Sequence, residues 1–190
     1  MAAALVNVKL LGRVFPICAN IKLNISEQRG HQNMRIVVTG GAIIRDSRGR
    51  ILLQQRSDYG DWGLPGGGMN PGETIQETMI REVIEETGLS VKDCEFYAVY
   101  SGPRMEYTYP DGNKVVFVMF LFNAWTNHNE LLSEDGDMIN FQDDQFESLK
   151  LQFWNISDIS LDQINSVQRP VFEDLLNGNK NILRYKTLIR

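Results

Sequence analysis

The sequence has little cysteine. Its 190 residues include only Cys18 and Cys94, which lie far apart and form no CxxC pair. That arrangement argues against a disulfide framework and against a cysteine metal site. We therefore expect both to be buried thiols of a protein in the reducing cytoplasm.

Long hydrophobic runs are also missing. The longest, Val115–Phe122, is far shorter than the ~20 residues of a membrane helix, so we interpret it as a buried strand. The apolar N-terminus is interrupted by Lys9 and Arg13 and has no basic leading region. It is expected to belong to the mature protein rather than to a signal peptide. No membrane partner is expected.

Positive charge is scarce as well. With 19 Lys and Arg against 24 Asp and Glu, the net charge is −5, which disfavours a duplex nucleic acid as partner. An acidic protein can still bind an anionic substrate when a metal cation lies between them. The length fits one ordinary domain, and the 43% hydrophobic content is that of a soluble globular protein.

The pattern of elements indicates a mixed sheet with helices on both faces, an α/β (α+β) fold. We expect residues 50–56 to return from strand 34–44 as a hairpin, and the Gly- and Pro-rich stretch 57–73 to be an irregular working loop. The other expected strands are 91–100, 114–125 and 149–156, and helical segments are expected near 158–166 and 169–176.

Between them, residues 75–87 are expected to form a helix. Thr74 and Glu77 are spaced as a capping box, and Gly88 stands where a left-handed cap ends a helix. One broad arc is apolar and should be buried. Its members are Ile75, Met79, Ile80, Val83 and Ile84.

The neighbouring arc of this helix carries Glu82, Glu85 and Glu86. Two such charges about 6 Å apart repel by about 3 kcal/mol at an effective dielectric constant near 20. Arg81 can neutralise only part of this repulsion. A solvated acidic face is the ordinary interpretation. However, the preceding "LPGGGMNPGE" lets backbone groups approach a ligand, and clustered carboxylates suit Mg²⁺ or Mn²⁺ together with a phosphate substrate.

Gly67, Glu73 and the run "REVIEETGL" at 81–89 together resemble the complete signature of the Nudix hydrolase family. The resemblance covers about residues 39–160. It implies a Nudix-type α/β/α sandwich, with its loop–helix–loop signature and terminal helices, over residues 34–190. Residues 1–33 would be an N-terminal extension of uncertain structure.

The resemblance also implies roles for individual residues. Glu82, Glu85 and Glu86 would bind one or more Mg²⁺ or Mn²⁺ ions, and Glu82 or Glu85 would orient or deprotonate a water molecule. Glu73 would pair with Arg81, and Gly66 or Gly67 would offer a backbone carbonyl oxygen to the metal.

Glu147 matches an acidic position that some members use as a further metal ligand or base. Asp143 and Asp144 lie close to it, so a surface acidic loop is the interpretation that the sequence favours.

Substrate contacts are less well specified. Arg56 and Trp62 flank the glycine-rich loop and are candidates for contacting phosphate or base, although Trp62 could equally pack the loop. Tyr107 and Tyr109, on an expected hairpin with Arg104 nearby, could stack on a base, but ordinary cross-strand pairing is favoured. We expect His31 and His128 to be solvated and assign neither to catalysis.

The function implied is hydrolysis of a phosphoanhydride bond in a nucleoside diphosphate linked to another group, such as ADP-ribose or a nucleoside triphosphate. The alternatives are a catalytically silent module that senses nucleotides or nucleotide sugars, and a pyrophosphohydrolase of RNA 5′ ends. The sequence does not decide the oligomeric state. A homodimer, in which the N-terminal segment pairs with that of a second copy, is the assembly considered.

Overall fold

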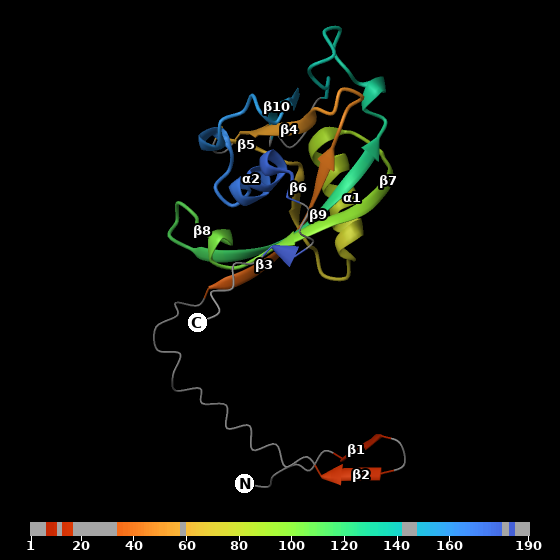
Figure 1. The fold of residues 1–190 in the computed structure, drawn as a ribbon, viewed down its shortest axis with the longest axis vertical. Helices are drawn as coiled ribbons and strands as arrows, with labels where there is room; N and C mark the ends of the chain where they lie inside the picture. The colour runs from red at the N-terminus through yellow and green to blue at the C-terminus, as the bar shows by residue number, and fades with distance from the viewer. Residues whose placement is uncertain are drawn as a thin grey trace. The chain divides into compact units, whose positions relative to one another are not determined.

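The computed structural model describes residues 7–10, 13–16, 34–57, 60–141, 148–179 and 183–184. The chain divides into two compact units, Met1–Gln32 and Asn33–Arg190. In the first unit, β1 (Asn7–Leu10) and β2 (Arg13–Pro16) pair as an antiparallel hairpin (Figure 1). Within the described ranges, no helix has the length and apolar character needed to cross a membrane.

The larger unit is built on a mixed sheet in the order β11-β7-β9-β3-β6, with β8 added to β9. β3 and β9 run parallel, whereas β7 and β6 pair antiparallel to them. This arrangement confirms the expected mixed sheet. The strands are β3 (Arg35–Ile44), β6 (Gly66–Gly68), β7 (Val91–Tyr100), β8 (Glu106–Thr108), β9 (Lys114–Thr126) and β11 (Leu183–Arg184).

The expected hairpin between residues 34–44 and 50–56 forms only at its turn, where Arg45 pairs antiparallel with Ile51 in a single bridge. β4 (Ile51–Arg56) leaves β3 and joins a second sheet, where it lies between β10 (Ser148–Trp154) and β5 (Trp62–Gly63). The pairing goes no further because β9 takes one edge of β3, and β6 together with Pro65 takes the other edge from Thr39 to Ala42.

The stretch 57–73 is more regular than its glycine content suggests, because it contains β5 and β6. Gly66–Gly68 pair with β3 from Gly41 to Thr39, and backbone pairing needs no side chain. The helical segment expected near 158–166 is only a 3₁₀ turn at Leu161–Gln163, whereas α2 (Arg169–Asn177) forms as expected. Two further 3₁₀ turns lie at Pro103–Met105 and His128–Glu130.

Helix α1 (Ile75–Thr87) has both expected ends, the Thr74–Glu77 capping box and a left-handed Gly88. The helix packs directly on β3 at Gly40, where a Cβ atom would lie 2.8 Å from the carbonyl oxygen of Ile75. The expected apolar arc is partly wrong, because Ile84 is 47% exposed. The buried face is rotated toward Glu86, so polar groups occupy part of it.

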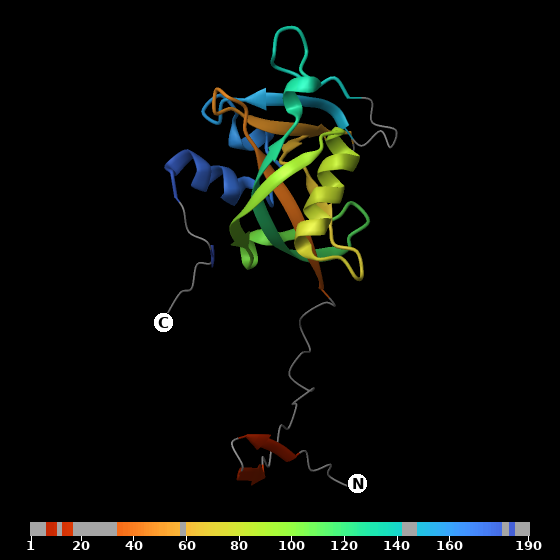
Figure 2. The ribbon, with the colours of Figure 1, turned by 90° about the vertical axis from the view of Figure 1, so that its right-hand side faces the viewer.

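The two long helices cover opposite faces of the main sheet (Figures 1 and 2). Successive residues of β3 point to opposite faces. Ala42 and Ile44 therefore share a hydrophobic cluster with Met79 of α1, whereas Ile43 shares the other cluster with Phe172 of α2. β3 is buried on both sides. The glycine-rich segment pairs with it and α1 packs on it, so β3 sets the positions of both.

Candidate active site

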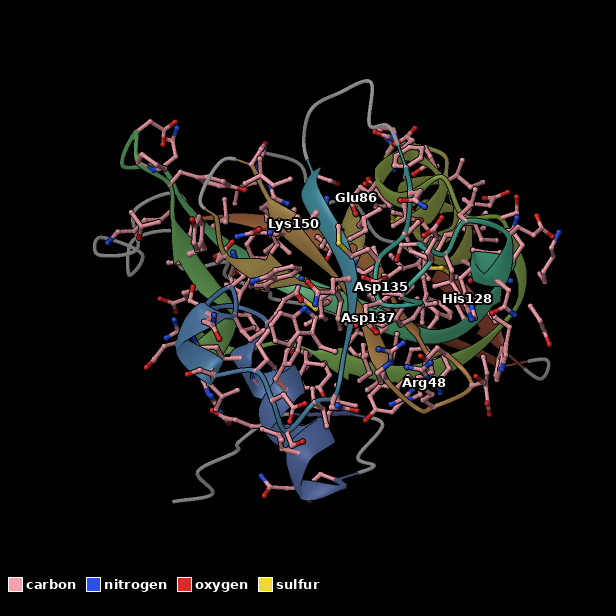
Figure 3. The ribbon with its side chains drawn as sticks, turned by 90° about the horizontal axis from the view of Figure 1, so that it is seen from above. Arg48, Glu86, His128, Asp135, Asp137 and Lys150 are labelled. Atoms are coloured by element: carbon pink, nitrogen blue, oxygen red, sulfur yellow. The ribbon has the colours of Figure 1, made fainter. Side chains whose placement is uncertain are left out.

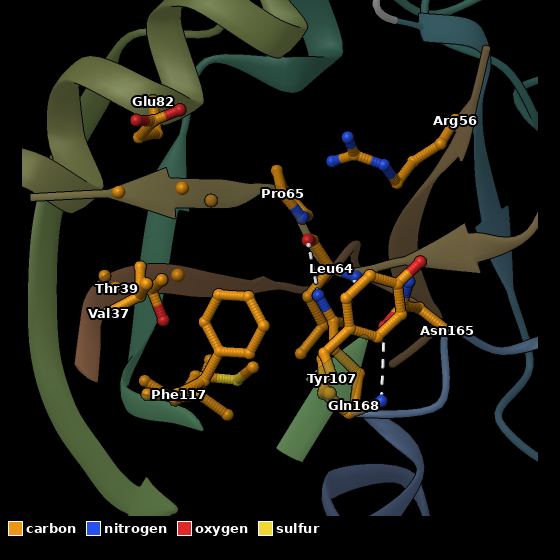
Figure 4. A pocket seen from close by; sticks show the side chains of 18 of the residues that line it. Val37, Thr39, Arg56, Leu64, Pro65, Glu82, Tyr107, Phe117, Asn165 and Gln168 are labelled. Carbon is orange, nitrogen blue, oxygen red and sulfur yellow. Dashed lines mark hydrogen bonds between the residues drawn. The ribbon is translucent and has the colours of Figure 1, made fainter. Parts of the chain in front are cut away.

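A pocket of about 440 Å³ opens over the face of β3 and β9 that points away from the core of α1 (Figure 4). Its floor follows the parallel register, in which Val37 lies beside Phe117, and Thr39 beside Met119. Glycine residues of β6 line one wall, and Arg56, Asn165 and Gln168 line the opposite side. The pocket thus joins segments that are more than 100 residues apart.

At one end of the pocket the glycine backbone lies directly against an acidic side chain. A Cβ atom on Gly67 would lie 2.4 Å from the Oε2 atom of Glu82. Gly66 has φ +145°, and a Cβ atom there would lie 2.4 Å from the Cα atom of Gly41. Only glycine fits both positions, since any side chain would displace either Glu82 or the β3–β6 pairing.

Glu86 is the buried carboxylate of this end, with 4% of its surface exposed. The backbone N–H of Gly66 donates a hydrogen bond of 2.7 Å to its Oε2 atom. Burial, helped by the charge of Glu82, raises the pKa of Glu86 to about 8 against the lowering effects of Gly66, Arg56 and Gln54. The site therefore stabilises the neutral form of Glu86.

Arg81 donates hydrogen bonds to the other carboxylates of the signature. Its Nε atom donates to Glu73 over 2.6 Å, and its Nη1 atom donates to Glu82 over 2.8 Å and to Glu85 over 2.9 Å. A further bond of 2.9 Å from Nη2 to the carbonyl oxygen of Gly68 fixes the guanidinium against β6. Arg81 is also the main reason that the pKa of Glu73 falls to about 2.

Glu85 differs from its neighbours because its side chain is 53% exposed and does not line the pocket. Glu82 and Glu86 both do. The expectation that all three glutamates share one flank is therefore only partly met. Adjacent helix positions are separated by about 100°, so Glu85 points toward the rim while Glu86 turns inward.

The donors present fit a divalent cation of the Mg²⁺ type. Glu82, Glu86 and the backbone of Gly66 and Gly67 are hard oxygen donors around one pocket, and Mg²⁺ takes few protein ligands while keeping several waters. In the part of the chain that the structure describes, no three acidic, histidine or cysteine side chains form a ready-made metal cluster. Glu147, the other candidate ligand, lies outside the described residues.

Of the remaining candidates for substrate contact, some line the pocket and others do not. Arg56 lines the pocket near Glu86, and Figure 4 shows its guanidinium pointing inward. Trp62 lies in the core, edge-to-face with Trp154 at 5.4 Å between ring centroids, so it packs the loop. Arg104 forms a bidentate pair with Glu173.

Tyr107 and Tyr109, for which ordinary cross-strand pairing was favoured, both line the pocket. They also contact each other edge-to-face, with their ring centroids 5.1 Å apart. The sequence could not reveal this placement, because it depends on the pairing of β8 with β9 beside β3.

The expectation for His128 is wrong. The ring is buried, lies 3.1 Å from the hydroxyl of Thr126 and packs against Phe153, apart from Glu86 (Figure 3). Burial lowers its pKa, so a neutral, structural histidine is favoured. Cys94 is only half-buried and accepts a hydrogen bond from Gln76. His31 and Cys18 lie outside the described residues.

Sequence reasoning missed several pocket residues, namely Thr39, Phe117, Asn165 and Gln168. Phe117 had a signal, because alternate residues of the run 115–122 must share one face of a strand. Asn165 and Gln168 had none. They reach the pocket because the chain before α2 pairs with Trp62, through a hydrogen bond from the N–H of Asn165 to the carbonyl oxygen of Trp62.

Parts of this chain are similar to known proteins. Residues 35–175 match the family described as NUDIX domain. An RNA pyrophosphohydrolase of Serratia proteamaculans (strain 568) is 43% identical over 58 residues, which are 30% of this chain and 33% of that protein. A putative 8-oxo-dGTP diphosphatase of Bacillus subtilis (strain 168) is 38% identical over 64 residues, 34% of this chain and 43% of that protein.

Among solved structures, the MutT protein from Methanosarcina mazei Go1 superposes with a TM-score of 0.56 at 21% identity, covering 80% of this chain and all of that one. This similarity shows the fold. The two curated relatives are each matched over less than half of their length.

Proposed function

Since the chain belongs to the NUDIX domain family, we propose that it hydrolyses a phosphoanhydride bond in a nucleoside diphosphate linked to another group, using Mg²⁺ or Mn²⁺. ADP-ribose and nucleoside triphosphates are substrates of this class. The single observation that carries the proposal is that Glu82, Glu86, Arg56 and the glycine backbone of β6 surround one end of one pocket.

The cation would be held by Glu82, Glu86 and a carbonyl oxygen of Gly66 or Gly67, with Glu85 joining from the rim. When bound, it supplies charge neutralisation for the phosphates and a water of lowered pKa. Arg56 faces the same end and provides a positive charge for a phosphate oxygen.

Other residues act by positioning. Arg81 ties Glu82 and Glu85 to Glu73 and to the carbonyl oxygen of Gly68, so the start of α1 and the glycine-rich segment keep one geometry. Gly66 holds Glu86 through its N–H group. Glu82 is the candidate to accept a proton from the attacking water, because it lines the pocket while Glu85 does not.

The alternatives are weaker but testable. A sensing module without catalysis is disfavoured by the presence of all the signature carboxylates, and such a module would bind nucleotide without turnover. The RNA alternative is supported by the names of several relatives, which are RNA pyrophosphohydrolases. The net charge of −5 disfavours it, since RNA binding normally uses a basic surface.

The test is a substrate panel of nucleoside triphosphates, ADP-ribose and a 5′-triphosphorylated RNA oligonucleotide, each with Mg²⁺, Mn²⁺ or a chelator. We expect turnover of a small nucleotide only with a divalent cation. Glu82→Gln should lower kcat by roughly 10²- to 10⁴-fold, the range of general acid–base contributions. The matched control is Glu95→Gln on β7, an exposed position outside the pocket. Full turnover in the chelator, or in Glu82→Gln, would refute the proposal.

A further inference from the structure

The pocket has a positive charge at the end remote from its carboxylates. The charged side chains among the described residues that line it are Arg35, Arg56, Glu82 and Glu86. Arg56 acts on Glu86, and Glu82 lies against Gly67, which pairs with Gly40 of β3. Arg35 precedes Gly40 by five positions on the same strand, about 17 Å at the rise of a β-strand. Arg35 is therefore separated from the other three charges along the pocket.

The guanidinium of Arg35 is not committed to a carboxylate of the protein. No hydrogen bond or ion pair joins Arg35 to another residue that the structure describes, and the residue is exposed. By contrast, Arg50, Arg81 and Arg104 each pair with an acidic side chain of the chain itself. Arg35 can therefore pair with an anion from outside without breaking an interaction among the described residues.

The strand directs Arg35 toward the pocket. Successive residues of a strand point to opposite faces, so Arg35 shares its face with Val37 and Thr39, and all three line the pocket. Arg35 stands beside Val115 of β9, whose other neighbour is Tyr107 of β8. It also borders a second hollow beside β6, so it lies at the rim of the pocket rather than on its floor.

A second polar group on the same strand face lacks a partner. The Oγ1 atom of Thr39, which lines the pocket in Figure 4, is buried and has no hydrogen-bond partner among the described residues. Buried polar atoms are nearly always hydrogen-bonded, so this hydroxyl calls for a partner from the ligand or from water. Thr39 pairs with Gly68 and lies between the acidic end and Arg35. Strand β3 thus offers a ligand first a hydroxyl and then a cation.

From this placement we infer that Arg35 determines specificity: it receives a second phosphate, carried on the ribose of the nucleotide, at the end of the pocket remote from the anhydride. The substrate class is a nucleoside 5′-polyphosphate with a further phosphate on its 3′ oxygen. The ribose then lies between the two phosphates, where the hydroxyl of Thr39 can bond a sugar oxygen. A guanidinium suits the remote phosphate because it donates two parallel N–H bonds. The inference rests on the proposed function for the direction in which the nucleotide lies.

The first measurement compares two substrates on the unmodified protein. With Mg²⁺, adenosine 5′-triphosphate 3′-phosphate should have a kcat/KM about fivefold above that of ATP, through a lower KM. Fivefold is the upper range for an exposed ion pair. The advantage should shrink as NaCl is raised, because salt screens exposed charges. Equal kcat/KM for the two substrates would overturn the inference.

The second measurement changes the cation. Arg35→Gln should remove most of the preference for the 3′-phosphorylated substrate over ATP. Arg35→Lys keeps the charge but not the planar fork, so it should retain part of the preference. Arg48→Gln is the matched control, because Arg48 has a side chain that is 65% exposed and does not line the pocket. A preference that survives unchanged in Arg35→Gln would contradict the assignment.

A third substrate distinguishes two sources of a 3′ phosphate. A 5′-triphosphorylated adenosine dinucleotide carries a phosphodiester there, as RNA does, whereas the first substrate carries a monoester. We expect a larger gain over ATP for the monoester, because it has about two negative charges and the diester has one. Both gains should fall in Arg35→Gln. A gain for the dinucleotide alone that persists in Arg35→Gln would show that its second nucleotide makes the contact, and would refute the role of Arg35.

Binding separates this inference from the proposed function. Calorimetry on the unmodified protein should show adenosine 3′,5′-bisphosphate bound about fivefold more tightly than AMP, whether or not any substrate is hydrolysed. That result without turnover of any nucleotide would refute the proposed hydrolysis and leave the second phosphate site supported. Turnover of ATP with equal binding of AMP and the bisphosphate would refute the inference alone. Since this comparison uses only the unmodified protein, it remains decisive if Arg35→Gln does not fold.

Discussion

Two kinds of carboxylate lie within one turn of α1. Glu82 and Glu85, together with Glu73 from the preceding loop, surround the guanidinium of Arg81. Glu86 is adjacent in sequence but sits inside the protein against the N–H of Gly66. The pKa of Glu73 is lowered to about 2, chiefly by Arg81, whereas burial raises that of Glu86 to about 8.

The difference shows how one signature can serve two physical roles. The carboxylates around Arg81 have a positive charge supplied by the chain itself, so their geometry is set before any ligand arrives. Glu86 lies deeper, where the charged form is disfavoured, and a divalent cation would reverse that preference. We infer that Arg81 fixes the carboxylates at the entrance of the site. Glu86 is the carboxylate whose charged form would gain most from a bound cation.

The comparison is tested most directly by Glu86→Gln against Glu85→Gln. Glutamine keeps an oxygen that can accept from the N–H of Gly66, so the fold should be retained while the proposed cation would lose a charged ligand. We expect kcat/KM to fall by about 10²-fold or more for Glu86→Gln, a loss comparable to that of a catalytic acid or base. The loss for Glu85→Gln should be smaller, because its exposed side chain contacts Arg81 rather than the pocket.

Steady-state kinetics at saturating Mg²⁺, with circular dichroism to verify folding, measures this difference. The reverse order, with Glu85→Gln the more damaged variant, would show that the rim carboxylate is the principal ligand.

A smaller effect should appear in the pH dependence of stability without metal. The pKa of Glu86 is raised in the folded protein, so folding takes up a proton between about pH 4.5 and about pH 8. The free energy of unfolding should therefore decrease as pH rises through this window, by at most ~1.4 kcal/mol per pH unit. Glu73, whose folded pKa is depressed, acts oppositely: its contribution is present above about pH 4.5 and lost as pH falls toward about 2.

Urea unfolding in a chelator, between pH 5 and pH 8, measures the first of these slopes. Glu86→Gln should lack the decrease, and Glu73→Gln should retain it. Parallel curves for the unmodified protein and Glu86→Gln would mean that Glu86 is not the buried acid.

The sequence was a good guide wherever a local rule decides the outcome. The capping box at Thr74, the left-handed Gly88 and the strand over 114–125 each depend on neighbours within a few residues, and all are confirmed. The signature residues were found because the family is recognised by the spacing of those residues along the sequence.

The sequence failed where long-range pairing decides. Residues 50–56 contain nothing to indicate that β6 and β9 pair with β3, so a hairpin extending beyond the Arg45–Ile51 bridge was the natural expectation. The different burial of Glu85 and Glu86 depends on the rotation of α1 about its axis, which Gly40 sets by allowing the helix to touch β3. The gathering of Tyr107, Tyr109 and Phe117 in the pocket depends on strands β8, β9 and β3 lying side by side.

The same long-range packing identifies a residue that no motif marks, Gln54, and gives the smallest expected effect. Gln54 is buried on β4, hydrogen-bonds Glu86, and donates to the hydroxyl of Ser148 over 2.7 Å. Ser148 in turn donates to the carbonyl oxygen of Glu86 over 3.2 Å. Gln54 thus orients the buried carboxylate from behind, as outer-shell partners do for metal ligands.

Gln54→Leu should therefore weaken the activation of the enzyme by Mg²⁺ by roughly tenfold, the lower limit for outer-shell partners, with a smaller change in the KM of the nucleotide. Gln55→Leu is the matched control, because its amide bonds the carbonyl oxygen of Gly60 and does not face the pocket. Titration of activity with Mg²⁺ distinguishes the two variants. Gln54→Glu should be worse than Gln54→Leu at neutral pH, because a second buried acid would further oppose the ionisation of Glu86 that binding of a cation requires. If Gln54→Leu and Gln55→Leu had the same Mg²⁺ requirement, the hydrogen bond from Gln54 would not help to hold Glu86. The difference between Glu86 and the carboxylates around Arg81 would then depend on burial rather than on a second layer of hydrogen bonds.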